Sequence, residues 1–276
     1  MIATPPSADG APGTSTARTF TTMGTVASLR AGVVTSALLE AIVAACLRID
    51  RLFSLYLPDS DLSRIARGEI GLWEADPVVT DAYAQAIEWR SATHGNFTPH
   101  RPDGTIDLSG IVKAIAIADV GDVLDAHSSS WLFSVGGDVL ARGDREGEPW
   151  RCGLADPAGS DALLGSLVLS PGHRAIATSG TTERGDHVWR TDRTNLFRQV
   201  TVAGPDIVTA DVLATAILAG GRDQLDRAVA EWPIDVVAVT SDSEILATGR
   251  IRSEWAVGCQ RAPKFAGSAS RPSSRS

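Results

Sequence analysis

The stretch TADVLATAIL, residues 209–218, places the carboxylate of Asp211 and, four residues later, the hydroxyl of Thr215 within almost wholly apolar sequence. Four residues is about one helical turn, so in a helix the two side chains project from one face, one above the other. An uncompensated buried carboxylate costs several kcal/mol. Asp211 therefore needs a cation, a set of hydrogen-bond donors or an exposed helix end.

Two interpretations of Asp211 are open from the sequence. Its position near the start of the expected helix, after Thr209, allows a carboxylate to interact with the helix dipole and with free N–H groups. That explanation does not extend to Thr215, which lies a turn further in. Carboxylate and hydroxyl oxygens are ligands that suit Mg²⁺, so a magnesium site is the second interpretation.

Three other features also have a structural and a functional interpretation. His187 lies among charged residues in ERGDHVWR, as either a solvent-facing histidine or a general base. Lys113, the only lysine between residues 1 and 263, lies in the apolar run SGIVKAIAIA. Its stem can extend to water, or its ammonium can bind a phosphate or another ligand. Gly136 and Gly137 indicate a tight turn or bulge between strands, or a close approach to a ligand.

The composition indicates a soluble globular protein, with 276 residues of which 43% are hydrophobic and 21% charged. Its formal net charge of −8 argues against general binding to nucleic acid or anionic lipid, because no basic field gathers phosphates. To bind an anionic substrate, the protein would need local positive charge from helix N-termini, a few basic residues or a metal. No window approaches the roughly 18 apolar residues of a membrane span, so membrane insertion is not expected.

The hydrophobic pattern predicts the elements that position these residues. Strand-like sequence over 20–33 precedes a helix over 36–54, and further helices are expected over 80–95 and 109–127. Short runs bounded by Gly, Pro and Asp then predict antiparallel strands within 131–143, 150–157, 163–172, 174–180 and 197–204. Helices over 209–221 and 222–232 precede a strand pair over 234–248. Because helices and strands occur in blocks, we predict an α+β fold.

Both ends of the chain have a composition typical of disorder. Residues 1–18 are rich in Pro, Ser, Gly, Ala and Thr, and they lack the basic start and apolar run of a signal peptide. We therefore expect a cytoplasmic location. Residues 261–276 are similarly biased. We predict one folded domain over 19–260, between a disordered N-terminal segment, 1–18, and a disordered C-terminal tail, 261–276.

Nine segments, in order over about residues 20–220, resemble the FAD:protein FMN transferases of the ApbE family. They are MGTVASL, FSLYLPDSDLSRIARG, GNFTP, IDLSGIVKAIA, SVGGDVLARG, WRCGLADP, AIATSG, GDHVW and TADVLATAI. An ordered set is more specific than any single motif. The resemblance implies an α+β domain of mixed or antiparallel sheets packed with helices. It also implies an enzyme that binds FAD, holds Mg²⁺ on the pyrophosphate and transfers FMN to a Ser or Thr of an acceptor flavoprotein, releasing AMP.

The same resemblance assigns roles to individual residues. Asp211 and Thr215 correspond to the family's metal ligands, together with a backbone carbonyl that corresponds to Gly110. His187 corresponds to the proposed base, so His187 and Asp211 are the expected catalytic residues. The expected contacts to the flavin cofactor are Met23, Ser54, Tyr56, Lys113 and Val188.

Three segments depart from the family pattern. The usual GGIAKG is SGIVKA here, FDPT is FTPH with Thr98 in place of a flavin-contacting Asp, and HIxDPxTG is HVWRTDRTN. The last segment keeps His187 and lacks the Asp-Pro pair that follows it. These changes leave a FAD-binding protein without turnover as an alternative. Water in place of the acceptor hydroxyl would give a second alternative, a Mg²⁺-dependent FAD pyrophosphatase that yields FMN and AMP.

Overall fold

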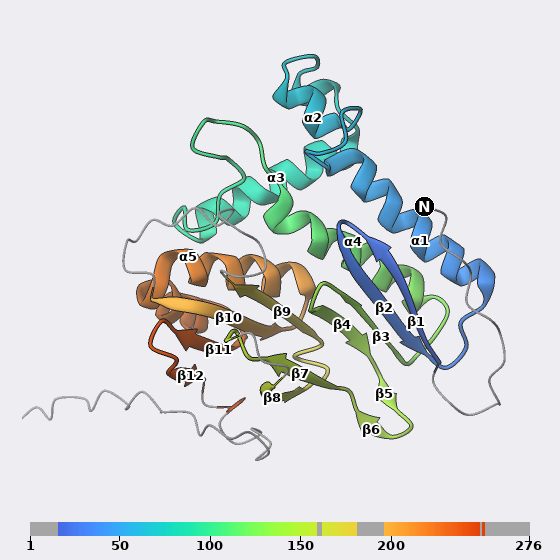
Figure 1. Cartoon of the computed structure of the whole chain (residues 1–276), viewed down its shortest axis with the longest axis vertical. Coiled ribbons are helices and arrows are strands. Elements are labelled where there is room, and N and C mark those ends of the chain that lie inside the picture. The colour runs from blue at the N-terminus through green and yellow to red at the C-terminus, as the bar shows by residue number, and fades with distance from the viewer. Residues whose placement is uncertain (1–15, 159–161, 181–195, 249, 252–276) are drawn as a thin grey trace, which may run out of the picture.

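An antiparallel sheet of eight strands runs through the described part of the chain, and helices cover one of its faces (Figure 1). The computed structural model describes residues 16–158, 162–180, 196–248 and 250–251. The strand order is β1-β2-β3-β4-β9-β10-β11-β12, and all neighbours are antiparallel. The strands are β1 Thr16–Thr22, β2 Thr25–Ala31, β3 Trp131–Val135, β4 Asp138–Arg142, β9 Ala175–Gly180, β10 Phe197–Gly204, β11 Asp235–Thr240 and β12 Ile245–Ala247.

The helices fall in two blocks, before β3 and after β10. They are α1 Ser36–Phe53, α2 Asp61–Ala66, a 3-10 helix η1 Leu72–Glu74, α3 Pro77–Ala92, α4 Ser109–Asp125 and α5 Ile207–Glu231. Two small strand pairs complete the described elements, β5 Asp144–Arg145 with β6 Glu148–Pro149 and β7 Arg151–Ala155 with β8 Leu163–Val168. The predicted α+β class is confirmed. The short elements α2 and η1 were not expected, because neither is long enough to show a helical period.

Side chains alternate between the two faces of the sheet, and this alternation divides the core. On β9, Ala175 and Ala177 belong to the apolar core beneath α1, α4 and α5, whereas Ile176 packs on the opposite side with β7 and β8. Figure 1 shows the helices and the β7–β8 pair on opposite sides of the sheet. Since successive residues of a strand point to opposite faces, Ser179 faces the helices and Thr178 faces away from them.

Most of the expected elements within the described residues are confirmed. The tight-turn interpretation of Gly136 and Gly137 is confirmed: they join β3 to β4 with φ angles of 56° and 93°, and Val135 pairs with Asp138. The N-terminal boundary differs, because residues 16–18 pair with β2 instead of being disordered. The rest of 1–18 and the tail 261–276 lie outside the described residues. None of the helices that the structure describes combines the length and apolar character needed to cross a bilayer.

The two helices predicted over 209–221 and 222–232 form one element, α5, which is broken at Gly221. This residue has φ 64° and ψ −146°, a conformation that residues with a Cβ atom rarely adopt. The loop before α4 packs near this break, where the side-chain amide of Asn96 donates to Gln224 Oε1 at 3.0 Å. Gly221 therefore allows the second half of α5 to change direction.

Replacing Gly221 tests this requirement. Gly221→Ala should lower the free energy of unfolding by about 1–3 kcal/mol, because the native backbone conformation strains a residue with a Cβ atom. Urea denaturation gives the measurement. Gly172→Ala is the matched control, since a Cβ atom at that exposed turn meets nothing within 4 Å, and it should change stability by less than about 0.5 kcal/mol. Equal effects of the two substitutions would contradict the role of Gly221.

Candidate functional site

Asp211 lies in the second turn of α5, fully buried between the sheet and α4. The N-cap of this helix is Asp206, whose carboxylate accepts a hydrogen bond from the amide of Thr209 at 2.8 Å. The N-cap role at this helix end therefore belongs to a different aspartate, and Asp211 lies one turn inside the helix. Its neighbour Val212 packs with Ile111 of α4, so Asp211 lies where the two helices meet.

Thr215 follows one turn later on α5 and reaches the central strand β9. Its Oγ1 atom lies 3.0 Å from Oγ of Ser179, a hydrogen bond in which either hydroxyl can be the donor. Ser179 is 1% exposed, and Thr215 is half-buried. The close approach follows from small side chains, because Ala177 of β9 and Ala214 of α5 share the same apolar cluster. The sequence did not indicate Ser179 as a functional residue.

Lys113 of α4 forms an ion pair with Asp138, the first residue of β4. The distance from Lys113 Nζ to Asp138 Oδ2 is 2.5 Å, and the side chains are 15% and 0% exposed. The other carboxylate oxygen of Asp138 accepts a hydrogen bond from the backbone amide of Thr178 at 3.0 Å. The ammonium therefore has a buried partner that neither sequence interpretation of Lys113 included. One sequence feature could have indicated Asp138. It lies directly after the glycine turn, where the alternation of side chains along β4 directs it toward the helices.

Two consecutive residues of β9 connect these polar contacts. The amide of Thr178 holds Asp138, and through it Lys113, while the hydroxyl of Ser179 holds Thr215. We call Lys113, Asp138, Ser179 and Thr215, which these contacts link through β9, the polar cluster. Asp211, one turn before Thr215, extends this cluster along α5.

Gly110 lies in the first turn of α4, close to the GNFTP segment. A Cβ atom at this position would lie 3.0 Å from the ring of Phe97, so a larger residue would require the ring to shift by a few tenths of an ångström. Asp107 holds the start of α4 by accepting a hydrogen bond from the amide of Ser109 at 3.0 Å, and it pairs with Arg101 at 2.8 Å. Burial raises the pKa of Asp107, but the hydrogen bonds from Ser109 and the Arg101 guanidinium outweigh it, so the pKa lies below its usual range.

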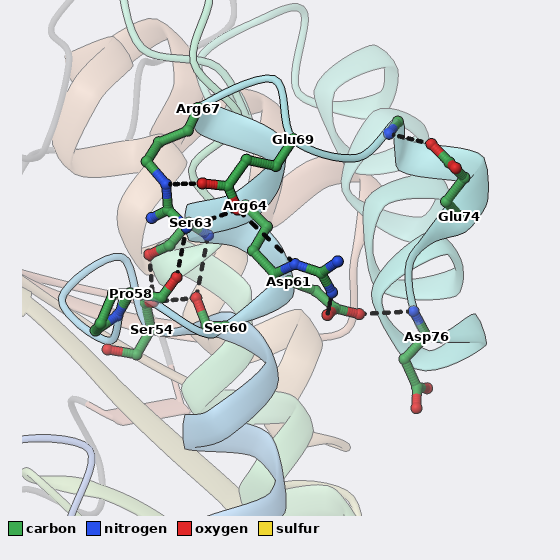
Figure 2. A network of polar contacts seen from close by, with 11 residues as sticks. Ser54, Pro58, Ser60, Asp61, Ser63, Arg64, Arg67, Glu69, Glu74 and Asp76 are labelled. Carbon is green, nitrogen blue, oxygen red and sulfur yellow. Dashed lines mark hydrogen bonds and ion pairs between the residues drawn. The ribbon is translucent and has the colours of Figure 1, made fainter.

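Ser54 lies in a separate polar network at the end of α1 (Figure 2), and Tyr56 follows it two residues later. The carbonyl of Ser54 accepts hydrogen bonds from the hydroxyl groups of Ser60 at 2.5 Å and Ser63 at 3.1 Å. The hydroxyl of Ser54 accepts a further one from the amide of Tyr56 at 3.2 Å. The Tyr56 side chain is 85% exposed. The network thus fixes the backbone on either side of Tyr56 and leaves its ring accessible.

Arg67 extends this network over the following turn. Its Nη2 atom donates to the carbonyl of Pro58 at 2.7 Å, and its Nε atom lies 2.6 Å from Glu69 Oε1 (Figure 2). Hydrogen bonding to Glu69 raises the pKa of Arg67 above its ordinary value. Segment 54–69, which carries Tyr56, is therefore held at several points along its length.

Met23 occupies the turn between β1 and β2 with a φ angle of 47°. Its side chain packs at the junction of two apolar clusters, one beneath the helices on the sheet and one between α1, α3 and α4. Met23 therefore borders the α4–α5 layer that contains the polar cluster. His187 and Val188, the expected base and a flavin contact, lie outside the described residues.

A model of the ApbE family matches residues 23–102 and 99–240 of the chain. A FAD:protein FMN transferase of Rhodobacter capsulatus is 27% identical over 194 residues, which are 65% of this chain and 37% of that relative. The chain therefore spans little more than a third of that protein's length.

Two solved structures show a similar fold. The flavinyl transferase ApbE of Pseudomonas stutzeri has a TM-score of 0.73 at 20% identity, over 89% of this chain and 98% of that one. The flavin transferase ApbE of Vibrio cholerae has a TM-score of 0.70 at 22% identity, over 87% and 99%. At such identities the likeness establishes the architecture, and it agrees with the family match.

The buried ion pair can be tested through stability. Asp138→Ala should lower the free energy of unfolding by about 3–5 kcal/mol, because it leaves the Lys113 ammonium buried without its carboxylate. Adding Lys113→Met should restore most of that loss in urea denaturation. Asp226→Ala, which breaks the exposed pair with Arg222 at 2.9 Å, should cost less than about 1 kcal/mol. Additive effects of the Asp138 and Lys113 substitutions would contradict direct coupling.

Proposed function

The chain belongs to the ApbE family, and from this membership we propose that it is a FAD:protein FMN transferase. The reaction would join the FMN half of FAD to a Ser or Thr hydroxyl of an acceptor flavoprotein and release AMP. The Rhodobacter capsulatus relative bears this activity as its name, and the Vibrio cholerae and Pseudomonas stutzeri proteins are named flavin or flavinyl transferases.

The observation that carries this function is the position of Asp211 and Thr215. Both lie within the region that the family model matches, a turn apart on α5, where that helix meets α4 and β9. The carboxylate is fully buried although another residue caps the helix. A carboxylate and a hydroxyl that share one helix face supply the oxygen ligands that a hard divalent cation prefers.

The donor set fits Mg²⁺, which proteins usually hold through one or two carboxylates together with substrate phosphates. Asp211, Thr215 and the backbone carbonyl of Gly110 would bind the ion. When bound, it supplies positive charge to the pyrophosphate oxygens and to the departing AMP. Asp211 contributes the anionic oxygen, and its burial limits competition from water. The packing of Gly110 against Phe97 keeps the start of α4 close to the loop, so the carbonyl stays in place.

The flavin half of FAD would contact residues from several elements. They are Met23, Ser54, Tyr56, Lys113 and Val188. Asp138 orients the Lys113 ammonium, which brings positive charge to an anionic substrate in a protein of net charge −8. The exposed ring of Tyr56 has a face free to stack on an aromatic ligand, while the hydrogen bonds of Ser54 hold its backbone.

The transfer step needs positioning and charge neutralisation more than covalent help from the protein. The acceptor hydroxyl oxygen would form a bond to the FMN phosphorus, and the bond from that phosphorus to the bridging pyrophosphate oxygen would break. AMP leaves with that bridging oxygen. His187 would accept the proton of the attacking hydroxyl, as a histidine can near neutral pH.

Incubation with FAD, Mg²⁺ and candidate acceptor proteins tests this function. The expected product is an acceptor that stays fluorescent after denaturation and gains the mass of FMN, with an equal amount of AMP. AMP release without any acceptor would instead identify a FAD pyrophosphatase. Intact FAD after long incubation with the metal would identify a binding protein without turnover.

Asp211→Ala should reduce Mg²⁺-dependent turnover by about 10³-fold, since metal stabilisation of the transition state is worth several kcal/mol. FAD affinity should fall less, because the flavin and adenosine contacts remain. AMP formation and a FAD binding titration separate the two effects. Asp206→Asn on the same helix is the control, because asparagine caps helices as well as aspartate does. Retained Mg²⁺-dependent turnover in Asp211→Ala would remove this residue from the site.

His187→Ala should lower the rate of FMN transfer by about 10²–10⁴-fold, the usual contribution of a positioned general base. FAD binding should remain close to that of the wild type, since the base acts on the acceptor. Single-turnover kinetics and a FAD titration provide the two measurements. Loss of FAD affinity with an unchanged transfer rate would identify His187 as a ligand contact instead.

A further inference from the structure

We infer that Ser179 is a positioning residue that orients the hydroxyl of Thr215 for binding a divalent cation, which rests on the proposed function of that site. The two hydroxyl oxygens are 3.0 Å apart, and Ser179 is 1% exposed. Ser179 lies on β9, which pairs with β4 on one side and β10 on the other. Its place is therefore determined by the sheet, not by the helix that carries Thr215.

The requirement for an acceptor follows from the chemistry of a hydroxyl ligand. A threonine hydroxyl has one proton and two lone pairs, and it binds a cation through a lone pair. The proton must then point away from the ion, and the ion's charge strengthens the need for an acceptor. Ser179 Oγ lies where it can accept that proton, and its burial excludes a water molecule from this role. Outer partners of this kind hold ligands in the geometry that binding needs.

Without Ser179, the Thr215 hydroxyl can instead form a hydrogen bond within its own helix. A threonine within a helix readily donates to the carbonyl four residues before it, which here is that of Asp211. Its side chain would then be free to adopt the rotamer that makes this local bond. The hydrogen bond to β9 therefore holds Thr215 on the face of α5 where Asp211 also projects.

The same strand provides a matched control on its opposite face. Thr178 Oγ1 and Thr201 Oγ1 are 2.9 Å apart, and Thr201 is 1% exposed. This second hydroxyl pair links β9 to β10, and it faces away from α5. Thr201→Val removes one hydroxyl with almost no change of volume, as Ser179→Ala does on the helix-facing side. Only the latter should change cation binding.

The test is a Mn²⁺ titration in the presence of saturating FAD and without acceptor, with free Mn²⁺ measured by electron paramagnetic resonance. Ser179→Ala should weaken Mn²⁺ binding by about 10–100-fold, whereas Thr201→Val should bind as the wild type does. FAD binding in EDTA should be equal in all three proteins. Wild-type Mn²⁺ affinity in Ser179→Ala, or an equal loss in Thr201→Val, would overturn the inference.

A double variant shows whether Ser179 acts through Thr215. Ser179→Ala combined with Thr215→Val should bind Mn²⁺ no more weakly than Thr215→Val alone, and a further loss in the double variant would overturn the inference. A failure of the proposed function would give a different result from a failure of this inference. If Mn²⁺ binding depends on Asp211, Thr215 and Ser179 as expected, yet the wild type transfers no FMN, the proposed activity is wrong and the positioning role of Ser179 stands.

Discussion

The ion pair between Lys113 and Asp138 is the interaction on which the arrangement of the polar cluster depends. Both groups lie in the apolar layer between sheet and helices, where a single charge would be costly. Their mutual attraction ties α4 to β4, and the Thr178 amide ties the same carboxylate to β9. Three elements that are distant in the chain are thereby held together. The ammonium remains in a defined place without needing water to solvate it.

The second constraint is the alternation of side chains along β9. It directs Ser179 to the helices and Thr178 to the other face, so that neighbouring residues serve different contacts. Small residues on β9 and α5 allow the strand and helix to approach until two hydroxyl groups can form a hydrogen bond. The geometry at Thr215 is thus a product of packing. A site assembled in this way on a central strand and two helices is more rigid than one built on loops.

Segment 54–69, at the periphery of the fold, differs from the polar cluster in its exposure. Segment 54–69 packs Leu62 into the apolar cluster between α1, α3 and α4, and hydrogen bonds to the carbonyls of Ser54 and Pro58 hold its backbone. This segment presents the exposed Tyr56, whereas Asp211 is fully buried. In the proposed function the two regions would bind different parts of FAD. The accessible ring of Tyr56 would stack on the flavin, and the buried polar residues would bind the charged pyrophosphate and its cation.

Local patterns in the sequence were enough to predict the α+β class, the glycine turn before Asp138, and the shared helix face of Asp211 and Thr215. Each depends on neighbours within a few residues, which strand and helix periods encode directly. The family resemblance likewise followed from motifs read in order. The partners of Lys113 and Thr215 were decided by the tertiary structure, since Asp138 and Ser179 lie 25 and 36 residues away from them. No local period connects such positions; strand register and helix packing bring them together, and burial then makes their contacts obligatory.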